Sequence, residues 1–184
     1  SLAVPNREVQ LAYRDVFSLW MERGLADPAR VDALARSLLE GDAEALEVRL
    51  EELLLTTMSF HDPAGRDPEK LYHGFILGLL VQLEGRYEVR SNREAGLGRA
   101  DVLVRPKQAG QPGVVLELKV PRARRGETPE QALLAGAKQV RNKRYAAELA
   151  AAGAAPVHEL VVVFDGKRVW ARTVDEVLGG AGAG

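Results

Sequence analysis

The chain has 184 residues, of which 46% are hydrophobic and 28% are charged, as in an ordinary globular domain. It contains no cysteine, which excludes disulfide bonds and thiolate metal sites. No apolar run reaches the length of a membrane span, and the first residues lack a basic stretch followed by an apolar one. We therefore expect a cytoplasmic protein with no membrane partner.

The net charge of −1 hides a split between the two parts of the chain. Residues 1–69 carry a net charge of −7, and residues 70–184 carry +6. A local basic field suits a polyanionic ligand, although charge alone favours an ordinary solvated helix face. The bases that form the densest cluster are Arg122, Arg124, Arg125, Lys138, Arg141, Lys143 and Arg144.

The first third of the chain reads as helices. Apolar residues recur at helical spacing over residues 11–21, and Asp27-Pro28 supplies a cap and a first-turn proline for a helix through about residue 39. A further helix is expected over residues 43–55, with its leucines on one side. We expect a helical N-terminal segment (residues 1–58) whose boundary lies in the loop that follows it.

The rest of the chain reads as an α/β unit (residues 59–178) followed by a flexible tail (residues 179–184). The order is helix, three strands, helix, two strands, which predicts a mixed sheet flanked by helices. The expected helices cover residues 67–83 and 128–152, and the expected strands cover residues 87–93, 98–104, 113–120, 156–164 and 167–173.

Two of these strands carry acids where a buried strand usually has aliphatic residues. Asp101 precedes the run Val102-Leu103-Val104, and Glu117 lies inside residues 113–120 with Lys119 two positions later. Because strand side chains alternate faces, Glu117 and Lys119 project from the same face. Burying them costs desolvation free energy, and two carboxylates with an ammonium suit a divalent metal and a phosphate. The alternative is an edge strand whose charges face solvent.

The assembled pattern resembles the PD-(D/E)XK nuclease superfamily. The closer likeness is to the nuclease-like domain found C-terminal to AAA-ATPase-like domains in bacterial proteins, and it covers about residues 67–172. Ala100 stands where the superfamily's name has proline, a position that its members often vary. The stretches that carry the likeness are Leu71-Tyr72-His73-Gly74-Phe75, Ser91-Asn92-Arg93-Glu94, Gly98-Arg99-Ala100-Asp101, Glu117-Leu118-Lys119, and Lys138-Gln139 with Tyr145.

The resemblance implies a restriction-endonuclease-like core and a site for one or two Mg²⁺ (or Mn²⁺) ions. Asp101 and Glu117 match the metal-binding carboxylates, and the carbonyl of Leu118 can join them. Lys119 matches the lysine that orients or deprotonates the attacking water and steadies the pentavalent phosphate. Gln139 matches a glutamine that related nucleases place at the site. An ordinary exposed residue on the helix is an equally good interpretation.

Further residues are weaker candidates for the same site. His73 and Glu69 lie four apart on one helix face, where a satisfied core histidine and a helix-start acid are the plainer interpretations. Glu94 and Arg99 flank the turn before Asp101 and could equally pair with each other. Tyr145 could approach the phosphate, but core packing explains it better.

The sequence therefore predicts a Mg²⁺-dependent deoxyribonuclease with DNA as its partner, RNA being left open. No G-x-x-x-x-G-K-[ST] run is present, so an ATPase domain, if there is one, lies outside this chain. Two alternatives stay open. One is a nucleic-acid-binding module that keeps the fold without cleavage. The other is a regulatory or assembly domain whose leucine-rich N-terminal helices bind an ATPase or a second copy in a homo-oligomer.

Overall fold

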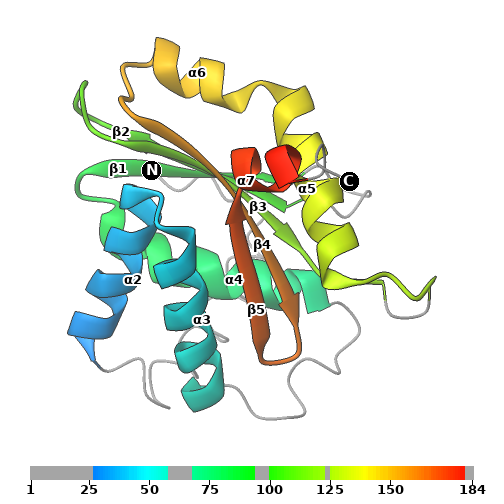
Figure 1. Cartoon of the computed structure of the whole chain (residues 1–184). Coiled ribbons are helices and arrows are strands. Elements are labelled where there is room, and N and C mark those ends of the chain that lie inside the picture. The colour runs from blue at the N-terminus through cyan, green and yellow to red at the C-terminus, as the bar shows by residue number, and fades with distance from the viewer. Residues whose placement is uncertain (1–26, 58–67, 94–99, 123–124, 181–184) are drawn as a thin grey trace.

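The computed structural model describes residues 27–57, 68–93, 100–122 and 125–180. Its helices and strands follow the order expected from the sequence, with some additions noted below (Figure 1). The helices are α2 (Pro28–Glu40), α3 (Ala43–Thr57), α4 (Pro68–Leu80), the short 3-10 helix η2 (Val81–Leu83), α5 (Pro129–Lys143), α6 (Tyr145–Ala151) and α7 (Val174–Gly180). The strands are β1 (Tyr87–Arg93), β2 (Ala100–Pro106), β3 (Gly113–Lys119), β4 (Val157–Asp165) and β5 (Arg168–Thr173).

The two N-terminal helices begin and end at local signals. Asp27 caps α2 by accepting a hydrogen bond from the Ala29 amide at 3.0 Å. Gly41 ends α2 in the left-handed region, with φ of 70°. Asp42 then accepts a hydrogen bond from the Ala45 amide at 2.9 Å, at the start of α3. Both predicted helices are confirmed, whereas the helix expected over residues 11–21 lies outside the described residues.

The strands form one mixed sheet in the order β1-β2-β3-β4-β5. β3 and β4 are parallel, and the other neighbouring pairs are antiparallel. The parallel pair requires a crossover, which α5 and α6 supply. This is the mixed sheet with flanking helices expected for a restriction-endonuclease-like α/β fold.

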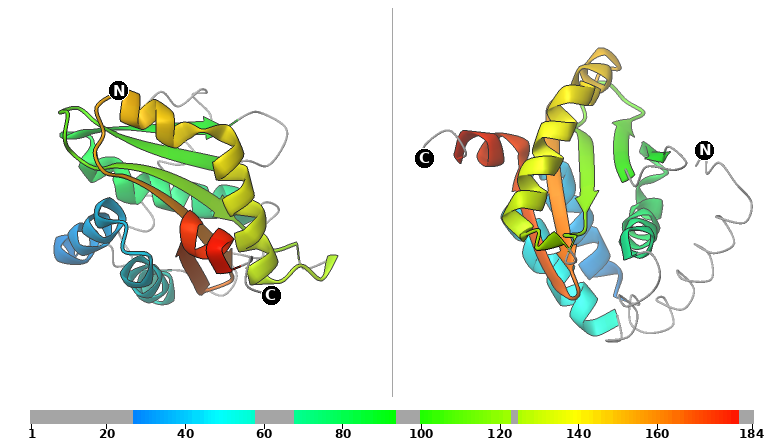
Figure 2. Two further views of the ribbon diagram at one scale, coloured as in Figure 1. Left: turned by 45° about the horizontal axis from the view of Figure 1, so that its top comes forward. Right: turned by 90° about the vertical axis from the view of Figure 1, so that its right-hand side faces the viewer.

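Helices cover both faces of the sheet (Figure 2). On one face the strands share a core with α2, α3 and α4, which includes Val114, Leu116 and Leu118 of β3. On the other face Val115 of β3 packs with α5, α6 and α7. The alternation of β3 therefore assigns position 117 to the face that α5 covers.

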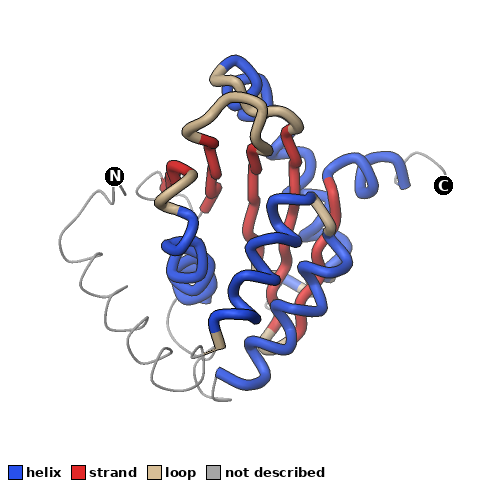
Figure 3. Tube along the Cα trace, turned by 90° about the vertical axis from the view of Figure 1, so that its left-hand side faces the viewer, coloured by secondary structure: helices blue, strands red, loops and turns tan. Residues whose placement is uncertain are grey.

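The N-terminal helices α2 and α3 pack against the sheet and share one hydrophobic core with it. Leu46, Leu50 and Leu54 of α3 are at most 1% exposed and lie in the same cluster as residues of β3, β4 and β5. Figure 3 shows this side of the molecule, with α2 and α3 next to each other in front of the strands. The predicted boundary loop falls in residues 58–67, outside the described residues, so its position stays a prediction.

Two features differ from the sequence expectation. The helix expected over residues 128–152 is broken at Arg144, whose φ of 56° is left-handed, so the chain forms α5 and α6. The break turns Leu149 of α6 into the same core as α5. Nothing in the local sequence signals it, because a left-handed residue at a helix end is usually glycine. The second difference is α7, which begins directly after β5 and extends to Gly180.

Tyr72 of α4 contacts both β4 and the turn between β4 and β5, and its burial leads to a testable prediction. Its ring stacks on Phe164 with centroids 4.4 Å apart, and its hydroxyl donates a hydrogen bond to the Gly166 carbonyl at 2.6 Å. Burial, with a smaller contribution from nearby Asp165, raises the pKa of Tyr72 to about 12. The unfolded chain releases this proton near pH 10, so the free energy of unfolding falls as pH rises from about 10 to about 12.

We expect Tyr72→Phe to remove this alkaline loss, at a cost of about 1 kcal/mol at neutral pH for the missing hydrogen bond. The raised pKa of Tyr72 can be measured by absorbance titration of the tyrosinate band in both proteins. One of the four tyrosines of the wild type should ionise at higher pH than the others, and this late step should be missing in Tyr72→Phe. A wild-type protein in which no tyrosine titrates at higher pH than those of Tyr72→Phe would contradict the prediction.

Candidate active site

The site is built on the neighbouring antiparallel strands β2 and β3. Asp101 is the register partner of Glu117. Directly opposed residues of an antiparallel pair have Cα atoms about 4.5–5.5 Å apart. The backbone therefore brings the two acidic positions together, although the side chain of Asp101 lies outside what the structure describes.

Glu117 is the most deeply buried charged residue in the described part of the chain, with 0% exposure. Its neighbour on the same face, Lys119, lies with Nζ 2.7 Å from Glu117 Oε1 and has a side chain that is 15% exposed. Lys119 Nζ also donates a hydrogen bond to Gln139 Oε1 of α5 at 2.8 Å. The structure thus assembles Glu117, Lys119 and Gln139 from β3 and α5.

The polar atoms of this group are incompletely satisfied. Among the described residues neither carboxylate oxygen of Glu117 accepts a hydrogen bond of good geometry, despite the short ion-pair distance to Lys119, and Gln139 Nε2 has no acceptor. Unpaired buried polar atoms cost free energy and are rare in folded proteins. Such atoms at one place indicate that the site is shaped for something further.

A divalent cation fits these atoms. Mg²⁺ and Mn²⁺ prefer hard oxygen ligands, and a buried carboxylate with unoccupied lone pairs supplies them. Within the described residues no three His, Cys, Asp or Glu side chains cluster closely enough to form a complete metal site. The remaining predicted ligands are Asp101 and the carbonyl of Leu118, which lies between Glu117 and Lys119 on β3. These ligand roles stay predictions.

Gly136 is a residue that the sequence analysis missed. A Cβ at this position would lie 2.6 Å from Val161 Cγ1, 3.4 Å from Lys119 Cγ and 3.5 Å from Glu117 Cγ. The glycine lets α5 approach β3 and β4 closely, which places Gln139 one turn later within reach of Lys119. The signal was the small-residue run Ala135-Gly136-Ala137, which is easily taken for an ordinary alanine-rich helix.

Comparison with known families identifies this arrangement. The family model described as the PD-(D/E)XK nuclease superfamily matches residues 67–174, more than half of the chain. The chain belongs to the PD-(D/E)XK nuclease superfamily. Membership indicates nuclease activity on a nucleic acid, and nucleases of this superfamily generally use divalent metals. Comparison with curated protein sequences gives no match.

The helix that opens the superfamily match carries two of the weaker candidates. His73 of α4 is 2% exposed, and its Nε2 lies 3.0 Å from Ser91 Oγ of β1. Ser91 is the register partner of Val102, which belongs to the core on the α4 face. His73 therefore lies across the sheet from Glu117. Glu69, in the first turn of α4, is half-buried. Glu94 and Arg99 lie outside the described residues.

Tyr145 is half-buried against the α5-side core, with Lys143 Nζ 5.5 Å from its ring centroid. This placement agrees with core packing.

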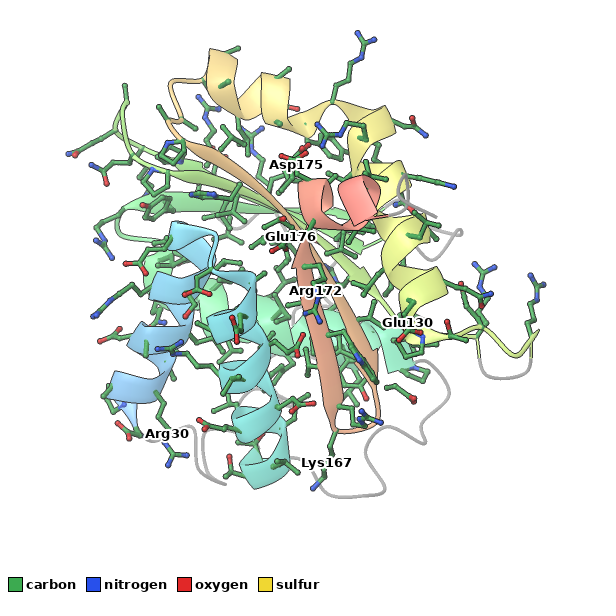
Figure 4. The ribbon with its side chains drawn as sticks, in the orientation of Figure 1. Arg30, Glu130, Lys167, Arg172, Asp175 and Glu176 are labelled. Carbon is green, nitrogen blue, oxygen red and sulfur yellow. The ribbon has the colours of Figure 1, made fainter. Side chains whose placement is uncertain are left out.

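The basic residues proposed to contact nucleic acid differ in their surroundings. Arg141 lies 3.5 Å from Glu159 and also pairs with Asp175 of α7, which is labelled in Figure 4. Its charge is thus partly neutralised within the chain. Arg141 is nevertheless exposed, as are Arg122, Arg125, Lys138 and Arg144, whereas Lys143 is half-buried and Arg124 lies outside the described residues. No helix in the described part of the chain combines the length and apolarity needed to cross a membrane.

Replacing Lys119 with methionine tests how Glu117 is stabilised. Removing the ammonium leaves a buried carboxylate without its ion-pair partner, which typically costs about 3 kcal/mol or more of unfolding free energy. We expect Lys119→Met to be destabilised by about that much in urea denaturation without metal, and Glu117→Gln/Lys119→Met to recover most of the loss. Lys138→Met, which removes an exposed lysine of α5, is the control. A Lys119→Met protein as stable as wild type would show that the ion pair does not compensate the burial.

Replacing Gly136 with alanine tests the close approach of α5. Alanine is the better helix former by about 1 kcal/mol, but overpacking against Val161 costs about 1–3 kcal/mol. We therefore expect Gly136→Ala to lower the melting temperature, and Gly136→Ala/Val161→Ala to be less destabilised than the two single losses summed. Thermal denaturation measures this, and a Gly136→Ala protein more stable than wild type would refute the steric argument.

Proposed function

We propose that this chain is a Mg²⁺- or Mn²⁺-dependent deoxyribonuclease that hydrolyses phosphodiester bonds of DNA with water as the nucleophile. One observation supports the proposal: the carboxylate of Glu117 is fully buried, accepts no hydrogen bond of good geometry from the described residues, and lies beside Lys119 and opposite position 101. Lys119 offsets part of the cost of burying this charge, and a ligand bound to the carboxylate oxygens would offset more of it. A cation held between carboxylates provides that compensation.

Each residue of the site has a role that its surroundings support. Asp101 and Glu117, with the Leu118 carbonyl, would hold the cation, which when bound supplies Lewis-acid activation of water and phosphate. Lys119 carries the positive charge that stabilises the phosphate as negative charge builds up on it. Gln139 accepts the Lys119 hydrogen bond through Oε1, which fixes the orientation of the ammonium. This leaves the two hydrogens of Gln139 Nε2 to donate to a phosphate oxygen.

The exposed bases would hold the rest of the substrate. Arg122 and Arg125 precede α5, and Lys138 and Arg144 lie on or at the end of it. Since α5 contributes Gln139 to the site, these cations belong to the element that borders the reacting phosphate. Contacts of this kind bind the backbone of DNA without reading its sequence, and they weaken as salt increases.

The setting of the nuclease is also a proposal. The resemblance of residues 67–172 to nuclease-like domains found after AAA-ATPase-like domains suggests a cytoplasmic, ATPase-linked protein. In that setting, nucleotide hydrolysis in another domain would control access of DNA to Glu117 and Lys119. RNA as substrate and a homo-oligomer are the alternatives that the same experiments address.

Cleavage assays test the activity directly. Purified protein is incubated with Mg²⁺ or Mn²⁺ and linear, circular or single-stranded DNA, with an RNA of the same sequence for comparison. We expect cleavage by wild type and by Lys107→Ala, and a loss of about a hundredfold or more in Glu117→Ala and Lys119→Ala, because each removes charge stabilisation at the reacting phosphate.

The outcomes separate the candidate functions. Cleavage that persists in both site variants would point to a contaminant or to another centre. Salt-sensitive DNA binding without metal-dependent cleavage would instead indicate a nucleic-acid-binding module that keeps the nuclease fold.

A further inference from the structure

β5 is an edge strand of the sheet, but its outer edge is covered by carboxylates. The amide of Val169 donates to Glu51 Oε1 at 3.0 Å, and the amide of Ala171 donates to Glu47 Oε2 at 2.8 Å. Both acids come from α3, which lies beside β5 in Figure 1. The next alternate amide, that of Thr173, donates to Glu176 Oε2 of α7 at 2.8 Å. Three successive outward amides of β5 therefore bond to side chains rather than to another strand.

The spacing of the two α3 acids matches the spacing of the strand. Four residues of an α-helix rise about 6 Å, and two residues of an antiparallel strand advance about 6.8 Å. Glu51 and Glu47 can therefore meet the amides of Val169 and Ala171, respectively, as carbonyl groups of a sixth strand would.

One outward carbonyl of the same edge, that of Ala171, is engaged as well. Arg172 donates to Glu47 Oε2 at 2.6 Å and to the Ala171 carbonyl at 2.5 Å. Arg172 and Glu176 are labelled in Figure 4 close to β5. Three amides and one carbonyl that a pairing strand would use are thus engaged within the chain.

Attachment of α3 to the sheet does not by itself explain these contacts. The helix already buries Leu46, Leu50, Leu53 and Leu54 in the core, each at most 3% exposed. Polar side chains aligned on an edge add little to that packing. They do remove a row of unpaired amides, which is the feature that lets sheets of two molecules join edge to edge.

We propose that Glu47 and Glu51 close the β5 edge against strand addition, and that the strand they exclude is β5 of a second copy of this chain. Two β5 strands related by a twofold axis would pair antiparallel and join two five-stranded sheets. Both acids lie before residue 67, outside the residues matched by the superfamily model. The closure is therefore a device that the N-terminal helical segment adds to the nuclease core, and it depends on neither metal nor nucleic acid.

The test compares Glu47→Ala/Glu51→Ala with Glu44→Ala/Glu52→Ala. The control pair lies on the same helix, is exposed and removes the same charge. Hydrogen exchange of residues 168–173 and light scattering over a range of protein concentrations are measured for both. At low protein concentration, where the first variant is monomeric, we expect exchange of its Val169 and Ala171 amides to accelerate at least tenfold, and not in the control pair. As the concentration rises we expect the first variant to form dimers, with unchanged helical circular dichroism.

Unchanged exchange at β5, or a protein that stays monomeric at every concentration, would overturn the proposal. Equal association of the control pair would also overturn it, because loss of negative charge would then be the cause. If the double variant does not fold, Glu51→Ala alone decides the question. Exchange must then accelerate at Val169 but not at Ala171, whose acceptor Glu47 is retained, and uniform acceleration would contradict the proposal.

Discussion

The burial of one carboxylate, that of Glu117, is the constraint around which this structure is organised. A charge with 0% exposure inside a β-strand has a large desolvation penalty. Lys119 and position 101 lie next to it because of strand alternation and register, while Gln139 reaches the same ammonium from α5. The same strand pairing and helix packing that form the fold therefore also set the positions of the site residues.

The topology explains why α5 lies over this carboxylate. The parallel pairing of β3 with β4 requires the chain to cross one face of the sheet, and α5 makes that crossing. Gly136 removes the side chain that would hold the helix away from β3. The opposite face carries α4, where His73 bonds to Ser91 within an otherwise apolar core. The Glu117–Lys119 pair and the His73–Ser91 pair thus lie on opposite faces of the sheet.

The N-terminal helices extend the nuclease core rather than standing apart from it. Leucines of α2 and α3 fill the face of the sheet that α4 leaves uncovered, and acids of α3 bond to the edge of β5. Most leucines of α3 are therefore buried within the chain, although Val48 and Leu55 of the same helix are exposed. A leucine-rich helix before a nuclease core can therefore complete the sheet instead of recruiting another molecule.

The sequence determined the elements and the contacts that depend on one element alone. Strand alternation placed Glu117 and Lys119 together, Asp27 and Gly41 set the ends of α2, and β1 has the predicted bounds. Only the tertiary structure decided which face each element presents to another, because that depends on how helices pack on the sheet. In the tertiary structure His73 lies across the sheet from Glu117, and the long helix is broken at Arg144 without a local sequence signal. Gly136 allows α5 to approach β3 and β4 closely. Periodicity along a helix shows which residues share a face, but it carries no information about which layer that face will meet.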